Sequence, residues 1–313
     1  MGLIQVKTGS LLSQTRQMLR RYDLRARKGL GQHFLIDEEV LGRIVDAAQL
    51  TSQDIIVEVG PGLGALTEAL AKLAGRVIAI ELDDRLAVLL AERLASFKNV
   101  TIINQDVLKV DPSALFRELK IKIPFGVNPQ DEPSAGYKVV ANLPYYITSP
   151  VLRHFLEAEL KPQSMLVMVQ KEVAEEIAAK PGKMSLLSIG VQLYGEPVIV
   201  AQVPAPAFYP APAVGSAILK VTPHSHPRVE INDEEGFFTL VRAGFCAARK
   251  QLANSLAQGL GVSKEESLSL LAKSEIAPQR RAETLSLEEW AHLWRVFRGW
   301  GNSDADCSGA GQD

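Results

Sequence analysis

A short turn with three glycines is the feature that most constrains the fold of this 313-residue chain. It occupies residues 58–64 as Glu-Val-Gly-Pro-Gly-Leu-Gly and directly follows the apolar run 55–59. Glycine lets a backbone turn tightly and lets a ligand approach without interference from a Cβ atom. With the helical pattern that follows at 65–74, the turn is typical of the first strand and helix of a nucleotide-binding α/β sheet.

Short runs rich in β-branched residues alternate with helical patterns through the first two thirds of the chain. Such alternation predicts a mostly parallel sheet with helices on both faces, and right-handed crossovers bring the loops after the strands to one edge. We therefore expect a Rossmann-like α/β sheet of seven strands. The predicted strands are 55–59, 76–80, 100–103, 138–141 and 165–169, with two more within 198–221.

The pattern also divides the chain. We expect a main domain at 27–225, in which a proline- and glycine-rich insertion occupies 120–137. Only helical spacing follows, which predicts a small C-terminal all-α domain at 226–298. Residues 1–26 are expected to form a basic, flexible arm that leads into a weak helix, and 299–313 a disordered tail.

The composition is that of a soluble globular protein, with 47% apolar and 22% charged residues. The two cysteines are far apart in the chain and suggest neither a disulfide framework nor a metal site. We expect a cytoplasmic protein, because no segment has the apolar length of a signal peptide or a membrane span. The net charge is −2, but residues 1–36 carry seven basic side chains against one acidic, a local charge of +6 that suits phosphates.

Carboxylates near the ends of three successive predicted strands indicate the cofactor. The glycines alone also satisfy the looser dinucleotide pattern, so an NAD-binding oxidoreductase is one alternative. Glu58, however, would repel a pyrophosphate and suits the cationic amino-acid end of S-adenosylmethionine. Glu81 closes the second strand, where a carboxylate accepts from both ribose hydroxyls, and Asp106 follows the third, where it accepts from the adenine amine. The predicted S-adenosylmethionine site comprises Glu58, Gly60, Gly62, Gly64, Glu81 and Asp106.

The sequence Asn-Leu-Pro-Tyr at 142–145 follows the fourth predicted strand, at the same edge of the sheet. An adenine amine is a poor nucleophile because its lone pair is delocalised into the ring. The Asn142 side-chain oxygen and a backbone carbonyl of Leu143 or Pro144 can accept hydrogen bonds from the two N–H groups of this amine. These hydrogen bonds aim the nitrogen lone pair at the methyl donor. Proline donates no hydrogen bond and stiffens the turn, and Tyr145 offers a flat face to an extruded base. Orientation and electrostatic alignment would then provide most of the rate.

From about residue 27 to 285 the chain resembles the bacterial small-subunit ribosomal RNA adenine dimethyltransferases, the kasugamycin-sensitivity methyltransferases. The matching segments are KGLGQHFL at 28–35, VEVGPGLGALT at 57–67, QDVL at 105–108, NLPYYIT at 142–148, MVQKEVA at 168–174, FYPAPAVGSA at 208–217, and the helical segments 245–256 and 281–285.

The resemblance implies S-adenosylmethionine as cofactor and a role for each matching residue. Gln32, His33 and Leu35 would cover the cofactor. Gly60, Glu81 and Asp106 would contact its methionine, ribose and adenine. Asn142, which would also lie beside the cofactor, would hold the target adenine together with Leu143, Pro144 and Tyr145, and Phe208 would sandwich the base with Tyr145. The residues implied to bind RNA are Arg27, Lys28, Arg249 and Lys250. The implied substrate is a pair of adjacent adenosines in the 3′-terminal hairpin of small-subunit rRNA, each dimethylated within a late pre-30S particle by a monomeric enzyme without metal.

Two departures from the family pattern remove basic residues. Ala213 stands after Pro-x-Pro where the family usually has a basic residue, and Ala248 replaces the first arginine of an Arg-Arg-Lys run. We expect a weaker basic RNA face at these positions and hypothesise that arginines of the N-terminal arm compensate. If deletion of residues 1–26 left RNA affinity and its salt dependence unchanged, that hypothesis would be wrong.

Two other functions remain open at the level of the sequence. A large-subunit rRNA adenine methyltransferase of the macrolide-resistance type shares the cofactor and Asn142 motifs, although the helical segments favour the small-subunit enzymes. A ribosome-assembly factor whose binding matters and whose catalysis is dispensable would have the same sequence features.

Overall fold

The computed structural model describes residues 9–121, 136–247 and 249–303. Most of the predicted 120–137 insertion and the last ten residues of the predicted tail lie outside these ranges, as does the start of the N-terminal arm. Across the described part of the chain, no helix is long and apolar enough to cross a membrane.

The chain forms two compact units. Unit 1 comprises the residues up to 174 together with 196–225, and unit 2 comprises 175–195 and the residues from 226 onward. The sequence analysis expected a single boundary near 225 and did not assign 175–195 to the helical unit. That segment is helical and packs on later helices, and local periodicity does not report such long-range contacts.

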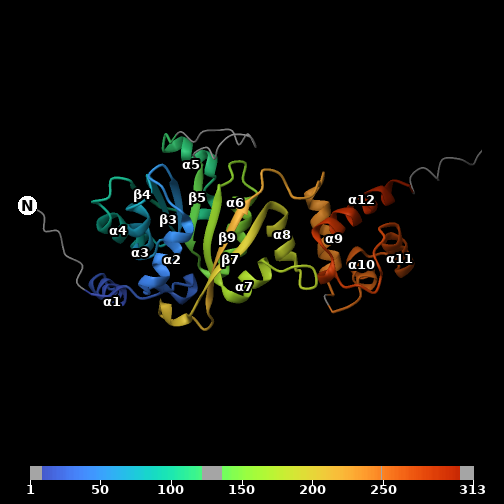
Figure 1. Ribbon diagram of the computed structural model, residues 1–313, viewed down its shortest axis with the longest axis horizontal. Coiled ribbons are helices and arrows are strands. Elements are labelled where there is room, and N and C mark those ends of the chain that lie inside the picture. The colour runs from blue at the N-terminus through green and yellow to red at the C-terminus, as the bar shows by residue number, and fades with distance from the viewer. Residues whose placement is uncertain (1–8, 122–135, 248, 304–313) are drawn as a thin grey trace, which may run out of the picture. The chain divides into compact units, whose positions relative to one another are not determined.

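Within the described residues, seven strands form one sheet in the order β4-β3-β2-β5-β6-β9-β7 (Figure 1). Strands β2 to β6 pair in parallel, and β9 pairs antiparallel to β6. The predicted mostly parallel, seven-stranded Rossmann-like sheet is therefore confirmed. The strand order reverses between β2 and β5, which is where such sheets open a crevice beyond their carboxyl ends. The strands are β2 (Ile55–Val59), β3 (Arg76–Glu81), β4 (Val100–Asn104), β5 (Tyr137–Asn142), β6 (Ser164–Gln170), β7 (Gly195–Val203) and β9 (Ser216–Pro223).

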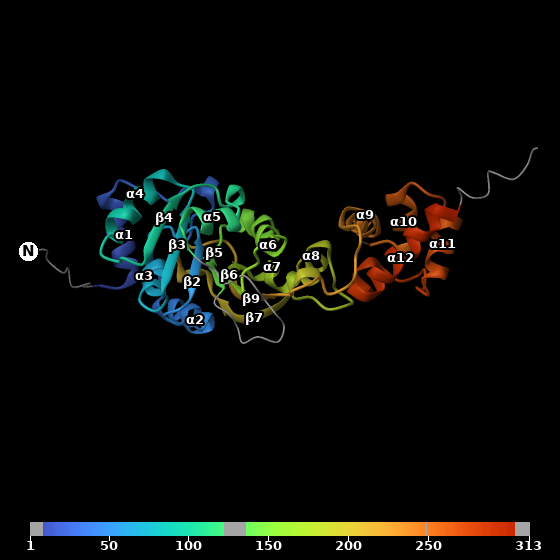
Figure 2. The ribbon, with the colours of Figure 1, turned by 90° about the horizontal axis from the view of Figure 1, so that it is seen from above.

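Helices cover both faces of this sheet (Figure 2). On one face, α2 (Glu38–Ala48) and α3 (Ala65–Ala71) pack on Ile56 of β2 in a continuous apolar cluster. On the other, α5 (Pro112–Glu118) and α6 (Thr148–Leu156) place Phe116 and Phe155 against Tyr137 of β5, with ring centroids 4.9 and 6.4 Å away. Successive side chains of a strand point to opposite sides of the sheet. The largely apolar runs of these strands therefore make both faces of the sheet apolar.

Helix α1 (Leu11–Arg21) corrects the expectation of a flexible arm over its residues. The Ser10 side chain caps it by accepting from the Ser13 N–H at 3.4 Å. Leu11, Thr15 and Leu19 are buried along one side of the helix, and Leu19 joins an apolar cluster that includes α4 (Asp84–Arg93). This spacing of four residues is the pattern of an amphipathic helix, and α1 is the helix into which the arm was expected to lead.

Unit 2 is an all-helical assembly, as predicted for the C-terminal domain. Its core centres on Trp290 and Phe237, both fully buried. A Cβ atom on Gly244 would clash with the Trp290 ring, so glycine permits the close contact between α9 and α12. Helix α12 continues through residues 299–303, where the tail was expected to begin, because each added residue extends a helix already formed. The helices are α7 (Lys171–Ile177, which leads in from unit 1), α8 (Leu186–Tyr194), α9 (Glu234–Phe245), α10 (Leu252–Leu260), α11 (Lys264–Lys273) and α12 (Leu287–Ser303).

Candidate active site

The glycine turn between β2 and α3 has a left-handed backbone at all three glycines. The φ angles are 66° at Gly60, 60° at Gly62 and 81° at Gly64, a region that side-chain-bearing residues rarely adopt. A Cβ atom on Gly62 would lie 3.3 Å from the Phe34 ring, and one on Gly64 would lie 2.7 Å from Leu90. The turn therefore needs glycine both for its backbone conformation and for its close packing.

Glu58 is buried directly beneath this turn. The residue is only 1% exposed. Within the described residues, its Oε2 atom has no hydrogen-bond partner. Burial raises the pKa of Glu58 to about 8, an effect that nearby Glu81 increases and Thr67 reduces. An unmatched carboxyl oxygen in a cavity wall is a binding feature for a cation or an N–H group.

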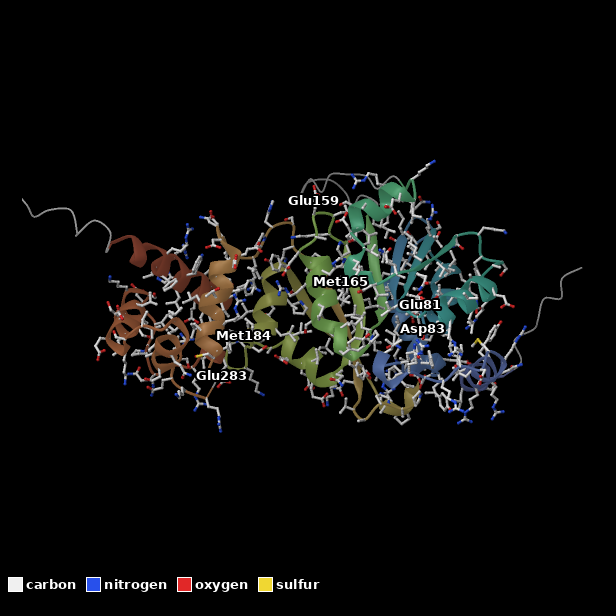
Figure 3. All side chains as sticks on the ribbon, turned by 180° about the vertical axis from the view of Figure 1, so that it is seen from behind. Glu81, Asp83, Glu159, Met165, Met184 and Glu283 are labelled. Carbon is white, nitrogen blue, oxygen red and sulfur yellow. The ribbon has the colours of Figure 1, made fainter. Side chains whose placement is uncertain are left out.

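Glu81 lies beside Asp83 at the end of β3 (Figure 3), and backbone N–H groups hold its carboxyl from two directions. Its Oε2 accepts from the Gly62 N–H at 3.1 Å and its Oε1 from the Asp83 N–H at 2.9 Å. Burial raises the pKa of Glu81, and these hydrogen bonds lower it. Gln32 donates to Asp83 Oδ2 at 3.3 Å, and Arg27 pairs with the same oxygen at 3.3 Å.

The sequence analysis missed Asp83, which fixes this corner of the site. Its position immediately before a helical pattern is typical of an N-cap, and its Oδ1 accepts from the Arg85 N–H at 3.1 Å. Asp83 thereby connects the start of α4 to Gln32, one of the residues expected to cover the cofactor.

A cavity of about 340 Å³ opens at this edge of the sheet. Its volume is that of a small-molecule site. It brings together every residue predicted for cofactor binding: Gln32, His33, Leu35, Glu58, Gly60, Gly62, Glu81, Asp106 and Asn142 line it, and Gly64 is in the turn beside it. Helix α1 also lines it, through Leu11, Gln14, Thr15 and Met18, which the sequence analysis did not foresee.

Asp106 has two roles at the cavity. Its Oδ1 accepts from the Leu108 N–H at 3.1 Å and so caps a short 3-10 helix, Val107–Lys109. The residue also lines the cavity. The capping and ligand-binding interpretations of this aspartate are therefore compatible.

Asn142 ends β5 at the cavity wall, and its amide has a defined orientation. Its Nδ2 donates to the His33 carbonyl at 3.0 Å, so the Oδ1 acceptor lies at the opposite end of the amide. Leu143 and Pro144 follow in the cavity lining. The Leu143 N–H donates to Met168 at 3.2 Å and the Pro144 carbonyl accepts from Ile147 at 3.1 Å, which holds the turn on both sides.

Tyr145 is anchored at its hydroxyl, which is 2.7 Å from Ser216 Oγ. Burial raises the pKa of the Tyr145 hydroxyl. Its ring stacks with His33 at a centroid distance of 5.8 Å and an interplanar angle of 25°. His33 is held in turn by Nδ1, which lies 2.7 Å from the Pro210 carbonyl oxygen. An aromatic ring and an imidazole thus stand side by side beside the Asn142 amide.

Phe208 is not at the cavity wall, in contrast to the sandwich that the resemblance implied. It is 2% exposed and belongs to the core cluster of unit 1. The short strand β8 (Phe208–Tyr209) pairs with β1 (Phe34–Leu35), placing Phe208 opposite Leu35. This pairing directs the ring into the core, and His33 is the ring that the structure places next to Tyr145.

Comparisons with known proteins identify the family. The family model described as ribosomal RNA adenine dimethylase matches residues 23–297. The chain belongs to the ribosomal RNA adenine dimethylase family.

Two relatives in this family are similar over nearly their whole length. The ribosomal RNA small subunit methyltransferase A of Dehalococcoides mccartyi is 52% identical over 297 residues, which cover 95% of this chain and 97% of that protein. The protein of the same name from Bacillus mycoides is 46% identical over 286 residues, 90% of this chain and 94% of that one.

Solved structures of related enzymes share the fold. The 23S rRNA methyltransferase ErmE is 26% identical with a TM-score of 0.62, and the match covers 85% of this chain and 99% of that one. A dimethyladenosine transferase from Plasmodium falciparum has a TM-score of 0.68 at 24% identity, covering 86% and 98% of the two chains.

Three of the four residues expected to bind RNA are exposed, one in unit 1 and two in unit 2. In unit 2, Arg249 and Lys250 are exposed, and Lys250 Nζ donates to Gln258 at 3.3 Å. In unit 1, Arg27 is half exposed and pairs with buried Asp83, so it also supports the cavity wall. Lys28 begins a 3-10 turn, Lys28–Leu30, and its side chain lies outside the described residues.

Proposed function

We propose that this protein transfers methyl groups from S-adenosylmethionine to the exocyclic amines of two adjacent adenosines in the 3′-terminal hairpin of small-subunit rRNA, dimethylating each. The observation that carries the proposal is the oriented Asn142 amide beside Tyr145 at the cavity edge, in a chain of the adenine dimethylase family. We further propose that it acts as a cytoplasmic monomer on a late pre-30S particle.

The cavity fits S-adenosylmethionine in its donor and acceptor groups. Buried Glu58 offers an unmatched oxygen to the cationic amino-acid end, Glu81 offers a fixed carboxylate to the ribose hydroxyls, and Asp106 lines the cavity where it can accept from the adenine amine. Gly60 and Gly62 have no Cβ atom, so the backbone of the turn is open to close approach by a ligand. When bound, S-adenosylmethionine supplies an electrophilic methyl group on positively charged sulfur.

Asn142 and Tyr145 prepare the target amine. In this proposal Asn142 Oδ1 accepts one N–H of the adenine amine, and a backbone carbonyl of Leu143 or Pro144 accepts the other. Both bonds draw the nitrogen lone pair out of the ring plane, and a fixed acceptor costs no reorganisation during reaction. The Tyr145 ring provides the stacking surface that holds the base at the correct depth.

The same arrangement serves both methylations. The amine becomes acidic only once it is alkylated and positively charged, and its proton then passes to water. Acceptors that hold the N–H groups are therefore sufficient, and a strong base is not required. After the first transfer one N–H remains, and Asn142 alone can hold it.

Unit 2 supports the proposal of a ribosomal substrate. Arg249 and Lys250 are exposed on a compact helical unit, and basic side chains bind RNA phosphates without reading sequence. We propose that this unit positions the enzyme on the particle, while the Asn142 site performs the chemistry.

The substrate is tested by transfer of labelled methyl groups to three RNAs. Immature small subunits that lack the modification, mature small subunits, and large subunits are incubated with the protein and labelled S-adenosylmethionine. The proposal expects label on the immature small subunits alone. Label on large-subunit RNA would instead indicate the macrolide-resistance class, and intact subunit binding without label would indicate an assembly factor.

A further inference from the structure

Helix α1 has two faces with different surroundings. Its inner face, which includes Leu11, Thr15 and Met18, lines the cofactor cavity. Its outer face carries Arg16, Arg20 and Arg21, all exposed. The helix is amphipathic, and only one of these faces is accounted for by the cavity.

The outer face of α1 is a concentrated positive surface. Residues 9–22 contain no aspartate or glutamate, and the first acidic residue after the helix is Asp23. Among the residues that the structure describes, none forms an ion pair with Arg16, Arg20 or Arg21. Three exposed arginines on one short helix create a local positive field that attracts an anionic partner.

Contacts connect this face to the base-holding end of the site. The Arg16 guanidinium lies 5.2 Å from the centroid of the Tyr209 ring. The next residue, Pro210, has its carbonyl oxygen 2.7 Å from His33 Nδ1, and His33 stacks on Tyr145. These contacts connect the charged face to the residues beside Asn142. An RNA strand whose base reaches Asn142 would therefore have its backbone close to this face.

The helix is held firmly enough to present these charges in fixed positions. Leu19 packs in an apolar cluster with Phe34 and Leu89. After the helix, the Tyr22 hydroxyl donates to Glu92 at 3.0 Å and Arg85 donates to the Asp23 carbonyl at 2.7 Å. A pre-ordered surface binds phosphates without first losing conformational entropy.

We propose that the outer face of α1 (Arg16, Arg20 and Arg21) binds the backbone phosphates of the RNA strand that carries the target adenosine. The proposal rests on the function proposed above and adds a contact surface in unit 1 to it. Arginine's planar fork suits phosphate oxygens, and such contacts position an RNA without reading its sequence.

The test compares two triple variants of the full chain that remove the same charge. The first is Arg16→Gln, Arg20→Gln and Arg21→Gln. The matched control is Lys98→Gln, Arg117→Gln and Lys120→Gln, three exposed positions. Lys98 lies just before β4 and the other two at the end of α5, and none of them lines the cavity. Binding to immature small subunits is measured against salt concentration, with methyl transfer and cofactor affinity measured in parallel.

The proposal expects the α1 variant to lower the slope of log affinity against log salt by about 2.1 to 2.7, at roughly 0.7 to 0.9 for each of three lost phosphate contacts. Between 50 and 200 mM salt, its affinity deficit relative to wild type should then shrink roughly 20- to 40-fold. Cofactor affinity should be unchanged, because the inner face of α1 is intact, and the control should keep the wild-type slope.

Three outcomes would overturn the proposal. If wild type binds and methylates small subunits but the α1 variant keeps the wild-type slope, this surface does not contact RNA while the proposed function stands. If both variants lower the slope equally, general charge rather than α1 is responsible. If wild type neither binds nor methylates small subunits, the proposed function fails, and this inference fails with it.

Discussion

Replacing the buried Glu58 with glutamine should change how the stability of unit 1 depends on pH. Burial raises the folded-state pKa of Glu58 from 4.5 to about 8, whereas the unfolded chain has the ordinary value. Between these values the folded state holds a proton that the unfolded state has released, so the free energy of unfolding falls as the pH rises. The loss is about 1.4 kcal/mol per pH unit, or roughly 5 kcal/mol over the whole interval.

Glu58→Gln keeps the shape of the side chain but does not titrate. The stability of wild type relative to this variant should therefore fall by about 3 kcal/mol between pH 5.5 and 7.5. All three tryptophans lie in α12, so their fluorescence reports on unit 2. Amide hydrogen exchange of β2, corrected for the intrinsic effect of pH on exchange, reports on unit 1. A difference between the two proteins that stays constant across this range would refute a protonated, buried Glu58.

Gly64→Ala should destabilise unit 1 by about 1–3 kcal/mol, because φ is 81° and the new Cβ would meet Leu90 at 2.7 Å; an unchanged unfolding midpoint would contradict this. Tyr145→Phe keeps the ring and loses only the 2.7 Å hydrogen bond to Ser216, so kcat/KM for methyl transfer should stay within several-fold of wild type. Tyr145→Ala removes a stacking surface worth about 1–3 kcal/mol, and kcat/KM should fall roughly 10- to 100-fold; steady-state kinetics that show no loss would exclude the stacking role.

The sheet and its cofactor edge could be predicted from the sequence because their signals are local. The parallel strands β2, β3, β5 and β6 are buried on both faces and are therefore largely apolar runs. The residues that follow the strands, such as Glu81 and Asp106, then converge at one edge because parallel strands end together. The cavity lining confirms that these residues meet.

What the sequence did not reveal depends on long-range contacts. The contribution of α1 to the cavity wall depends on Leu19 docking against residues from α4 and β1, which no local pattern specifies. Phe208 was assigned to the site by resemblance, but the pairing of β8 with β1 places it in the core. Asp83 was visible only as a helix cap, and its contact with Gln32 required the fold.

The most direct test of the central claim is to measure the nucleoside product made by wild type and by Asn142→Ala. Immature small subunits are treated with each protein, the rRNA is digested to nucleosides, and N6-methyl- and N6,N6-dimethyladenosine are quantified by mass spectrometry. Cofactor and subunit binding are measured for both proteins. We predict dimethyladenosine from wild type, and little or none from an Asn142→Ala variant that still binds both partners. Dimethylation by this variant at the wild-type rate would contradict the role of the Asn142 amide in holding the target amine.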